Sequence, residues 1–436
     1  MRLRTVYLDA DTPSAVESVI NRQSTLLNEE AERAARKILE QVRFLGESAL
    51  LDYTRKFDAP DIQSIRVTEQ ELSGAQPSVA EEIRLATARV RRFHEEQMRV
   101  VSQGWSSEGE WAFEDAHGNR TGQRVVPTRR VGVYVPGGKA DYPSSVVMNC
   151  VPALVAGVEQ VVVCCPPNRD GSLPPSVLFA CAGLGIREVY KLGGAQAIAA
   201  MAFGIGMERV DKIVGPGNAY VNAAKRMVWG LVGLDSYAGP SEACIVADDG
   251  ANPEWVAADL LTQLEHSEDC VGFVIALSED ILERAKKETL EQAESAPRRD
   301  AIVAALRDHS AFFLAPTREE ACGLANRIAP EHLTLMVREP EEWLSRIRTA
   351  GCVYLGDRTP QAAGDYLLGP SHTLPTARAA RFASPLSVLE FMKVMSVSRM
   401  SEAGLRALGP PTIALAESEG FPAHAEGVKK RLAKEE

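Results

Sequence analysis

Short apolar runs alternate with helical segments between Arg130 and Leu355, and this alternation constrains the fold more than any other feature. The strands expected in a first series are Arg130 to Pro136, Val161 to Cys165, Glu188 to Leu192, Lys212 to Val214 and Ala243 to Ala247. Those of a second series are Gly272 to Leu277, Ala311 to Leu314, Leu333 to Val337 and Cys352 to Leu355. Because strands that alternate with helices form parallel sheets, the fold class is α/β, with two Rossmann-like, doubly wound domains.

A chain of 436 residues exceeds one ordinary core, so we expect several domains of roughly 150 residues. Residues 1–25 are predicted to form an N-terminal segment and residues 384–436 a C-terminal, partly helical arm. The first Rossmann-like domain is expected to be discontinuous, made of residues 26–130 and 246–383, and the second to span residues 131–245. Helical spacing of apolar residues around Ile38 and Ile83 predicts an N-terminal helical region, and a hairpin is expected near Trp111.

The charge balance excludes some partners. A formal net charge of −11 argues against a nucleic-acid or anionic-membrane surface, since those partners need clustered Lys and Arg. No stretch approaches the ~20 apolar residues of a membrane helix, and the first residues lack the apolar core of a secretory signal. The eight cysteines form no Cys-x-x-Cys pair and are expected to be reduced, buried thiols of a cytoplasmic protein.

Three glycine-rich turns follow expected strands and open helices, at Val135-Pro-Gly-Gly-Lys139, Gly193-Gly-Ala-Gln196 and Gly215-Pro-Gly-Asn218. Free backbone N–H groups at such turns suit a phosphate or a ribose, and the three turns are expected to converge on one crevice. The usual Gly-x-Gly-x-x-Gly fingerprint is absent. The alternative, that these glycines only make tight turns, stays open for each one taken singly.

A second group of residues has the types that a metal ion selects. Gln263 and His266 are three apart on an expected helix and share a face, Asp365 and His372 lie in a glycine-rich region, and His424 stands in the tail. Imidazoles with a carboxylate suit Zn²⁺, whereas a carboxamide is a less usual ligand. A lone His on a helix is more often a surface or capping residue, so spacing alone leaves both interpretations open.

The pair Glu331-His332 follows Pro330, which is expected to end the preceding helix at Ala329 and to deliver the pair at the start of a strand. A carboxylate beside an imidazole offers two proton acceptors of different basicity, as an alcohol oxidation followed by water addition needs. The alternative is a solvated helix end.

Taken together, these motifs resemble those of the histidinol dehydrogenase family over nearly the whole chain. The segments that carry the resemblance are Val42-Arg-Phe-Leu-Gly46, Tyr53-Thr-Arg-Lys-Phe-Asp58, Val131-Gly-Val-Tyr-Val-Pro-Gly-Gly138, Gly193-Gly-Ala-Gln-Ala197, Asp211-Lys-Ile-Val-Gly-Pro-Gly-Asn218, Ala238-Gly-Pro-Ser-Glu242, Ile328-Ala-Pro-Glu-His332, Gly364-Asp-Tyr366, His372-Thr-Leu-Pro-Thr376, Glu419-Gly420 and His424. The resemblance implies NAD-dependent, zinc-assisted oxidation of L-histidinol through L-histidinal to L-histidine, a step of histidine synthesis.

The resemblance also assigns roles to individual residues. Zinc would be held by Gln263, His266, Asp365 and His424, and NAD contacted by Tyr134, Gln196 and Asn218. The acid/base pair would be Glu331 and His332. Substrate contacts would come from Ser241, His332 and Glu419, together with the four metal ligands. The first domain would thus carry the metal and catalytic residues and the second the NAD contacts.

A homodimer is implied as well, in which the arm, with Glu419 and His424, completes the partner's site.

Two positions depart from the family pattern: Ala377-Arg378 stands where small or glycine residues are expected, and Leu264 is larger than the expected Ala. The nearest alternative is an NAD- and zinc-dependent dehydrogenase of another small polyol or hydroxysulfonate on the same fold. A silent sensor that binds a nucleotide or a histidine-like ligand is a further alternative.

Overall fold

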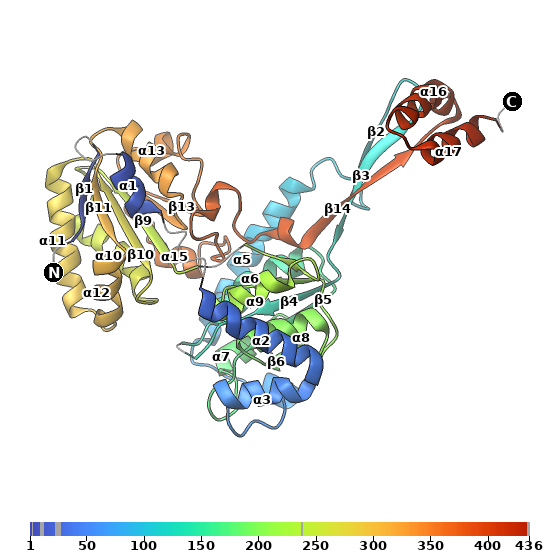
Figure 1. Cartoon of the computed structure of the whole chain (residues 1–436). Coiled ribbons are helices and arrows are strands. Elements are labelled where there is room, and N and C mark those ends of the chain that lie inside the picture. Colours follow the sequence, from blue (N-terminus) through green and yellow to red (C-terminus); the bar gives the residue numbers. More distant parts are fainter. Residues whose placement is uncertain (2, 9–12, 22–27, 139, 237–238, 434–436) are drawn as a thin grey trace.

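The computed structural model describes residues 1, 3–8, 13–21, 28–138, 140–236 and 239–433. They form two α/β lobes and an arm that projects from them (Figure 1). Lys139 of the first glycine-rich turn and Ala238 of the Ala238–Glu242 motif lie outside the described residues.

The first lobe is built on a six-stranded sheet in which every pairing is parallel. Its order is β1 (Thr5–Tyr7), β11 (Ala311–Leu314), β10 (Val271–Ala276), β9 (Glu242–Ala247), β12 (His332–Met336) and β13 (Cys352–Leu355). Alternate residues of these strands enter two separate apolar clusters, one on each face of the sheet. Both faces are therefore buried, which is why the strands are near-continuous apolar runs.

Helices cover both faces of this sheet. One cluster joins it to α10 (Pro253–Leu264), α11 (Glu279–Ser295) and α12 (Arg299–Asp308). The other joins it to α1 (Pro13–Ile20), α13 (Arg318–Ile328) and α14 (Pro340–Leu344).

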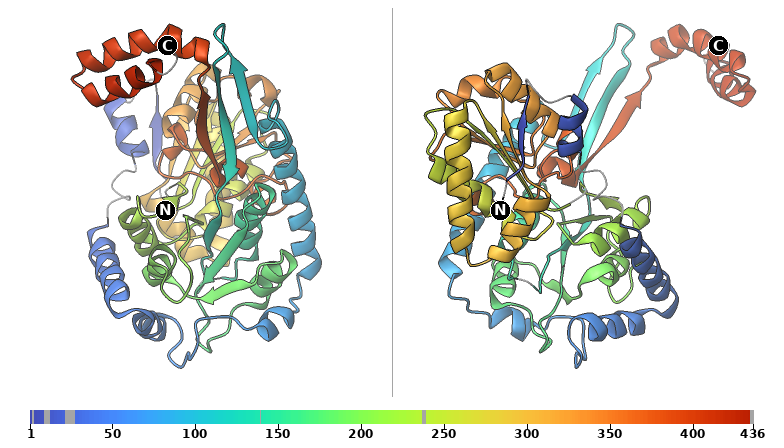
Figure 2. Two further views of the ribbon diagram at one scale, coloured as in Figure 1. Left: turned by 90° about the vertical axis from the view of Figure 1, so that its right-hand side faces the viewer. Right: turned by 60° about the vertical axis from the view of Figure 1, so that its left-hand side comes forward.

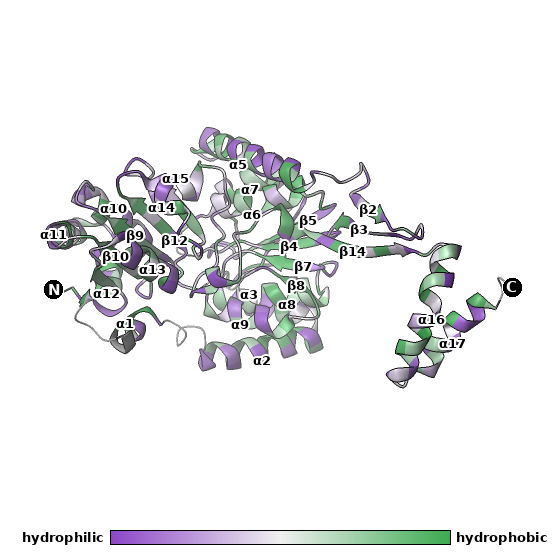
Figure 3. Ribbon diagram, turned by 90° about the horizontal axis from the view of Figure 1, so that it is seen from above, coloured by the Kyte–Doolittle hydropathy of each residue, from purple (hydrophilic) through white to green (hydrophobic). Residues whose placement is uncertain are grey.

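The second lobe contains a five-stranded parallel sheet with the order β6 (Glu188–Lys191), β5 (Gln160–Cys165), β4 (Arg130–Tyr134), β7 (Lys212–Val214) and β8 (Gly233–Leu234). One face packs on α4 (Glu69–Ser73), α5 (Ala80–Val101), α6 (Pro143–Val155) and α7 (Pro175–Gly183). The other packs on α2 (Glu29–Leu45), α3 (Glu47–Phe57), α8 (Gly194–Phe203) and α9 (Ala219–Val228). Figure 3 shows apolar strands between helices with polar outer faces.

The arm begins as an antiparallel sheet. A hairpin of β2 (Glu110–Glu114) and β3 (Arg120–Pro127) pairs with β14 (Met392–Arg399), which leads into α16 (Glu402–Ser418) and α17 (Pro422–Leu432). Figure 1 and the right view in Figure 2 show this arm standing away from the lobes, with the C-terminus near its tip. Before it, α15 (Gln361–Tyr366) and two 3₁₀ turns, Ala379–Arg381 and Val388–Phe391, connect the first lobe to β14.

The alternation predicted a doubly wound α/β fold, and this is confirmed by the two parallel sheets. The distribution of segments between the lobes differs from the expected boundaries. Strand β1 and helix α1 join the first lobe, and α2, α3 and α5 pack on the second. Strand β9 belongs to the first sheet although it follows the second lobe's strands in sequence. Local pattern identifies a strand but not its neighbours, which tertiary packing selects.

One helix end also differs from the prediction. The helix expected to carry both Gln263 and His266 ends at Leu264. Within the described residues, no helix combines the length and the apolar character needed to cross a membrane. All eight cysteines are free thiols, and seven of them are buried.

Candidate functional site

A pocket of about 250 Å³ lies between the two lobes and gathers most of the residues singled out from the sequence. The first lobe lines it with Ser241, Gln263, His266, Glu331, His332 and Asp365. The second lobe contributes Pro136 and Gly217, which follow β4 and β7. Ligands of open α/β sheets bind outside the carboxyl ends of the strands, and here the turns after β4 and β7 occupy that place.

The pair Glu331-His332 is placed by the turn that the sequence predicted. Helix α13 ends at Ile328, Ala329 caps it in the left-handed region with φ +47°, and His332 is the first residue of β12. Glu331 is 7% exposed and His332 2% exposed. Their side chains are in contact, with 3.6 Å between His332 Nδ1 and Glu331 Oε2. The alternative interpretation, that this pair is only a solvated helix end, is therefore wrong, since both side chains are buried in the pocket wall.

The neighbouring strand holds this pair through Glu242, a residue to which the sequence analysis gave no role. The Glu242 backbone N–H donates to Glu331 Oε2 at 2.9 Å, and the Glu331 N–H donates to Glu242 Oε2 at 3.3 Å. The ring nitrogen Nδ1 of His332 lies 3.0 Å from the Glu242 carbonyl oxygen. This leaves His332 Nε2 buried without a hydrogen bond, 3.5 Å from Asp365 Oδ1. The imidazole therefore presents Nε2 to the site.

Burial and neighbouring charges shift the pKa values of both groups. Desolvation, with help from the charge of Glu242, raises the pKa of Glu331 to about 8. Burial opposes a charge on His332, but the carboxylates of Glu331 and Asp365 outweigh it and raise the pKa of His332 to about 9. Two titratable groups with strongly raised pKa values in one pocket are a mark of a catalytic site.

Three of the four expected zinc ligands lie together. Gln263 Nε2 donates to Asp365 Oδ2 at 3.2 Å, and His266 lines the same pocket just beyond the end of α10. The prediction that Gln263 and His266 share a helix face is wrong in detail, because His266 follows the helix end. Burial lowers the pKa of His266, which favours the neutral, metal-binding form of its ring.

These three residues alone do not supply the four ligands expected for zinc. Among the described residues, no cluster of three or more His, Cys, Asp or Glu side chains is arranged to hold a metal. An amide oxygen, an imidazole and a carboxylate fit a borderline cation but leave one tetrahedral position open. His372, a metal-ligand candidate from the sequence to which the family resemblance assigns no ligand role, also lines the pocket, with Nδ1 2.8 Å from the Asp365 carbonyl oxygen. This contact ties the segment after α15 to the end of that helix, which carries Asp365.

The residues expected to contact NAD lie beside the pocket, in the second lobe. The Tyr134 hydroxyl accepts a hydrogen bond from the Gly194 N–H at 3.1 Å, which joins the turn after β4 to the turn after β6. Gln196 is 1% exposed in the first turn of α8. Asn218 caps α9 by accepting from the backbone N–H groups of Tyr220 and Val221. All three line turns of the same sheet edge, as the sequence predicted.

A buried ion pair supports the third of these turns. Lys225 donates to the Gly215 carbonyl oxygen at 3.0 Å, and the Gly215 N–H donates to Asp235 at 2.7 Å. Lys225 and Asp235 also pair with each other, and each side chain is 4% exposed. Gly215 has φ +110°, and a Cβ there would meet the Tyr134 carbonyl oxygen at 2.1 Å. The turn therefore needs glycine and is fixed from both sides.

Glu419 and His424 are not brought to the pocket of their own chain. Both are exposed and lie in the arm, at the end of α16 and the start of α17.

The structure also shows the surroundings of the residues that depart from the family pattern. Ala377 and Arg378 take φ values of +51° and +65°, the region that favours glycine. Leu264 is fully buried in the core behind Gln263.

Comparisons with known proteins agree over the whole length. The family model described as histidinol dehydrogenase matches residues 21–432. A histidinol dehydrogenase of Caulobacter vibrioides is 44% identical over 98% of this chain and 99% of its own. One of Brucella melitensis is 45% identical over 93% of this chain and 94% of its own. The crystal structure of histidinol dehydrogenase from Elizabethkingia anophelis superposes with a TM-score of 0.90 at 33% identity, covering 99% of this chain and 98% of that one.

Proposed function

The chain belongs to the histidinol dehydrogenase family, and on that premise we propose that it oxidises L-histidinol through L-histidinal to L-histidine with NAD in the cytoplasm. The observation that carries the proposal is the pocket in which Glu331, His332 and Asp365 meet Gln263 and His266. It combines a buried proton-transfer pair with a face of metal-binding side chains, opposite the turns expected to hold a nucleotide. Nothing observed favours another polyol or a hydroxysulfonate as substrate.

In this proposal, His332 takes the hydroxyl proton of the substrate through Nε2, the ring atom that has no hydrogen-bond partner. The Nδ1 contact with the Glu242 carbonyl oxygen fixes the ring orientation. Glu331 then takes a proton from the water that adds to the aldehyde. Its carboxylate lies at the same wall of the pocket, held by the Glu242 N–H. The enclosing lobes keep the aldehyde from bulk water between the two oxidations.

Bound zinc would orient the amino alcohol through its nitrogen atoms, and NAD would accept the hydride in each oxidation. The residues present fit the metal, since Gln263, His266 and Asp365 offer three hard or borderline donors on one face. Ser241 lines the same pocket and lies within reach of a bound substrate.

We also propose that His424 supplies the fourth ligand, and Glu419 a substrate contact, to the site of a second copy. The arm supports this because its large apolar residues are unusually exposed: Leu415 is 65%, Val394 56% and Phe421 51% exposed. A second pocket of about 550 Å³ shares His266 and Tyr366 with the first and has a mainly apolar lining. It offers space beside the metal face for a segment of the partner.

Coexpression of two inactive variants tests this exchange of arms. A His332→Asn chain keeps an intact arm but has defective lobes, and a His424→Asn chain keeps intact lobes but has a defective arm. If arms cross, each mixed dimer regains one site, so a random mixture recovers about a quarter of wild-type activity. If each arm folds back onto its own chain, every site keeps one defect and the mixture stays inactive.

The reaction itself is tested by counting NADH formed by the purified, zinc-loaded protein from a limiting amount of L-histidinol. The proposal predicts two NADH per histidinol, with histidine as product, and loss of both in Glu331→Gln and His332→Asn variants. Turnover of another hydroxy compound but not of histidinol would contradict the substrate and retain the chemistry.

A further inference from the structure

Asp58, an acidic side chain that forms no ion pair with a described residue, lies beside the turn after β6. Asp58 follows the last residue of α3, and its backbone N–H donates to the Thr54 carbonyl oxygen. Its carboxylate lies against the turn after β6: a Cβ added at Gly193 would be 3.3 Å from Asp58 Oδ2. Gln196 Nε2, in the first turn of α8, lies 3.5 Å from the same oxygen.

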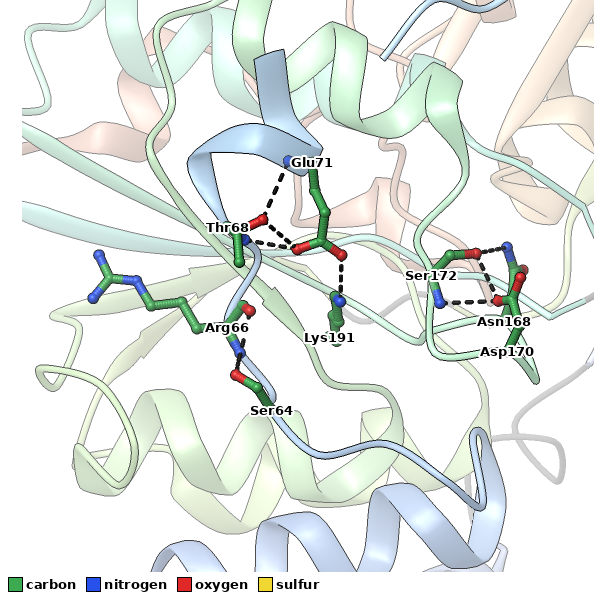
Figure 4. Close-up of polar contacts among 8 residues, drawn as sticks. All are labelled: Ser64, Arg66, Thr68, Glu71, Asn168, Asp170, Ser172 and Lys191. Atoms are coloured by element: carbon green, nitrogen blue, oxygen red, sulfur yellow. Dashed lines mark hydrogen bonds and ion pairs between the residues drawn. The ribbon is translucent and has the colours of Figure 1, made fainter. Parts of the chain in front are cut away.

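The segment after Asp58 is fastened to the edge strand of the second sheet. The Lys191 N–H donates to the Ile65 carbonyl oxygen at 2.6 Å, and the Val67 N–H donates to that of Val189 at 3.0 Å. Figure 4 shows Lys191 reaching Glu71, whose carboxylate also completes a capping box with Thr68. The Lys191 Nζ to Glu71 Oε1 distance is 2.5 Å. These contacts hold Asp58 at a defined place beside the end of β6.

The charge of Asp58 has no structural explanation. Burial raises its pKa to about 6, and within the described residues no Lys or Arg forms an ion pair with it. The nearby Oε1 of Gln196, a residue 1% exposed, is buried without a hydrogen-bond partner. The half-buried Asp58 carboxylate accepts a hydrogen bond from Gln196 Nε2, but a carboxylate has several acceptor sites, and a buried acceptor left unsatisfied, such as Gln196 Oε1, costs free energy. Their natural complement is a ligand that presents hydrogen-bond donors.

The order of the strand ends suggests which part of NAD would reach this place. In the proposed reaction the nicotinamide would lie at the pocket with His332, between the turns after β4 and β7. Tyr134, at the end of β4, accepts a hydrogen bond from Gly194 in the turn after β6, so the neighbouring strand ends lead from this pocket toward Asp58. The adenosine half of the dinucleotide would then lie beside Asp58, and its ribose offers two vicinal hydroxyl donors.

We propose that Asp58, with Gln196, binds the 2′ and 3′ hydroxyls of the adenosine ribose and makes the enzyme select NAD over NADP. An added 2′-phosphate would bring a second negative charge against the Asp58 carboxylate, and it would replace a donor by acceptors. Rossmann-like enzymes use an acidic side chain on the ribose in this way, but there it follows the second strand of the nucleotide unit. Asp58 instead comes from a segment upstream of the whole sheet.

The inference rests on the proposed use of NAD, and its test separates the two. Affinities for NADH and NADPH are measured by nucleotide fluorescence, without turnover, in the wild type, in Asp58→Asn and in Asp61→Asn. Asp61 is an exposed acid on the same segment and serves as the matched control. We expect the NADH preference to fall at least about tenfold in Asp58→Asn and to stay unchanged in Asp61→Asn. A parallel assay with histidinol should show a raised KM for NAD and a nearly unchanged kcat.

An unchanged NADH preference in Asp58→Asn, or an equal fall in the Asp61→Asn control, would overturn the inference. If Asp58→Asn folds poorly, Asp58→Ser removes the same charge in a smaller side chain and carries the same expectation. A wild type that discriminates NADH from NADPH through Asp58 but forms no NADH from histidinol would retain this inference and refute the proposed reaction.

Discussion

The two parallel sheets share one architecture and present different chemistry at the cleft between them. The first lobe brings buried titratable groups, Glu331, His332 and Asp365, whose charges interact directly. The second brings glycine turns, an amide and a helix cap, at Gly193, Gln196 and Asn218. A doubly wound sheet therefore determines where a ligand binds, whereas the side chains at the strand ends determine what is done to it. Each prediction below tests this division.

The largest effect is expected from the proton-transfer pair of the first lobe. Glu331→Gln and His332→Asn should lower kcat by about 10²- to 10⁴-fold, because each removes a group that we propose moves a proton. NADH affinity should change little, since both residues belong to the other lobe. Stopped-flow turnover with NADH titration measures both quantities. Equal losses of kcat and NADH affinity would contradict the assignment of chemistry to the first lobe and nucleotide binding to the second.

The second lobe should lose stability and nucleotide binding when its buried ion pair is broken. Lys225→Met leaves Asp235 uncompensated and should lower the free energy of unfolding by about 3–5 kcal/mol. In the protein that remains folded, the turn at Gly215 should loosen and the KM for NAD should rise more than kcat falls. Urea denaturation and steady-state kinetics check the two effects.

The control for Lys225→Met is Arg84→Met, which breaks an ion pair with Glu81 at the surface. The Arg84 side chain is 57% exposed and the Glu81 side chain 82% exposed. That change should cost at most about 1 kcal/mol. Similar losses in the two variants would mean that the buried pair does not support the turn.

The pH dependence of kcat should originate in the first lobe. Burial and the charge of Glu242 raise the pKa of Glu331 to about 8. Glu331 accepts a proton only as a carboxylate and His332, whose pKa is raised to about 9, only as a neutral ring, so kcat should rise as the pH rises through this range. Glu242→Gln removes a like charge, stabilises the carboxylate and should move the midpoint to lower pH. Asp58→Asn, in the second lobe, should leave the pH midpoint of the kcat profile unchanged. A shift of that midpoint would contradict the claim that the pH dependence originates in the first lobe.

The smallest effect concerns the loop beside Glu242. Ala377 is held at φ +51°, where a Cβ costs up to about 1–2 kcal/mol. Ala377→Gly should therefore stabilise the protein by up to about 1 kcal/mol, which thermal denaturation detects as a small rise in Tm. Ala35→Gly, in the regular helix α2, should instead lower Tm. A lower Tm for Ala377→Gly would show that the loop gains nothing from glycine.

Much of the fold was predictable because apolar runs and turns are local. Pro330 located the end of α13, and the strand that begins at His332 followed from it. The assignment of β1, α2 and β9 to lobes was not predictable, since it depends on contacts between distant segments.

The candidate site was partly predictable in the same sense. Motifs identified Gln263, His266 and Asp365, but their meeting in one pocket required the fold. Glu242 and Asp58 carried no role in the sequence analysis, because an isolated acid in a motif does not reveal what it faces. The signal for Glu242 is its burial, and the signal for Asp58 is that no Lys or Arg among the described residues forms an ion pair with it; both appear only in the folded structure.

The central claim is that one active site is assembled from both lobes of one chain and the arm of another. Zinc-edge anomalous diffraction from crystals grown with zinc, L-histidinol and NAD tests it most directly. The account predicts a zinc peak bound by Gln263, His266 and Asp365 of one chain and by His424 of the other, with the nicotinamide beside His332. A zinc ion elsewhere, or one bound by His424 of the same chain, would contradict it.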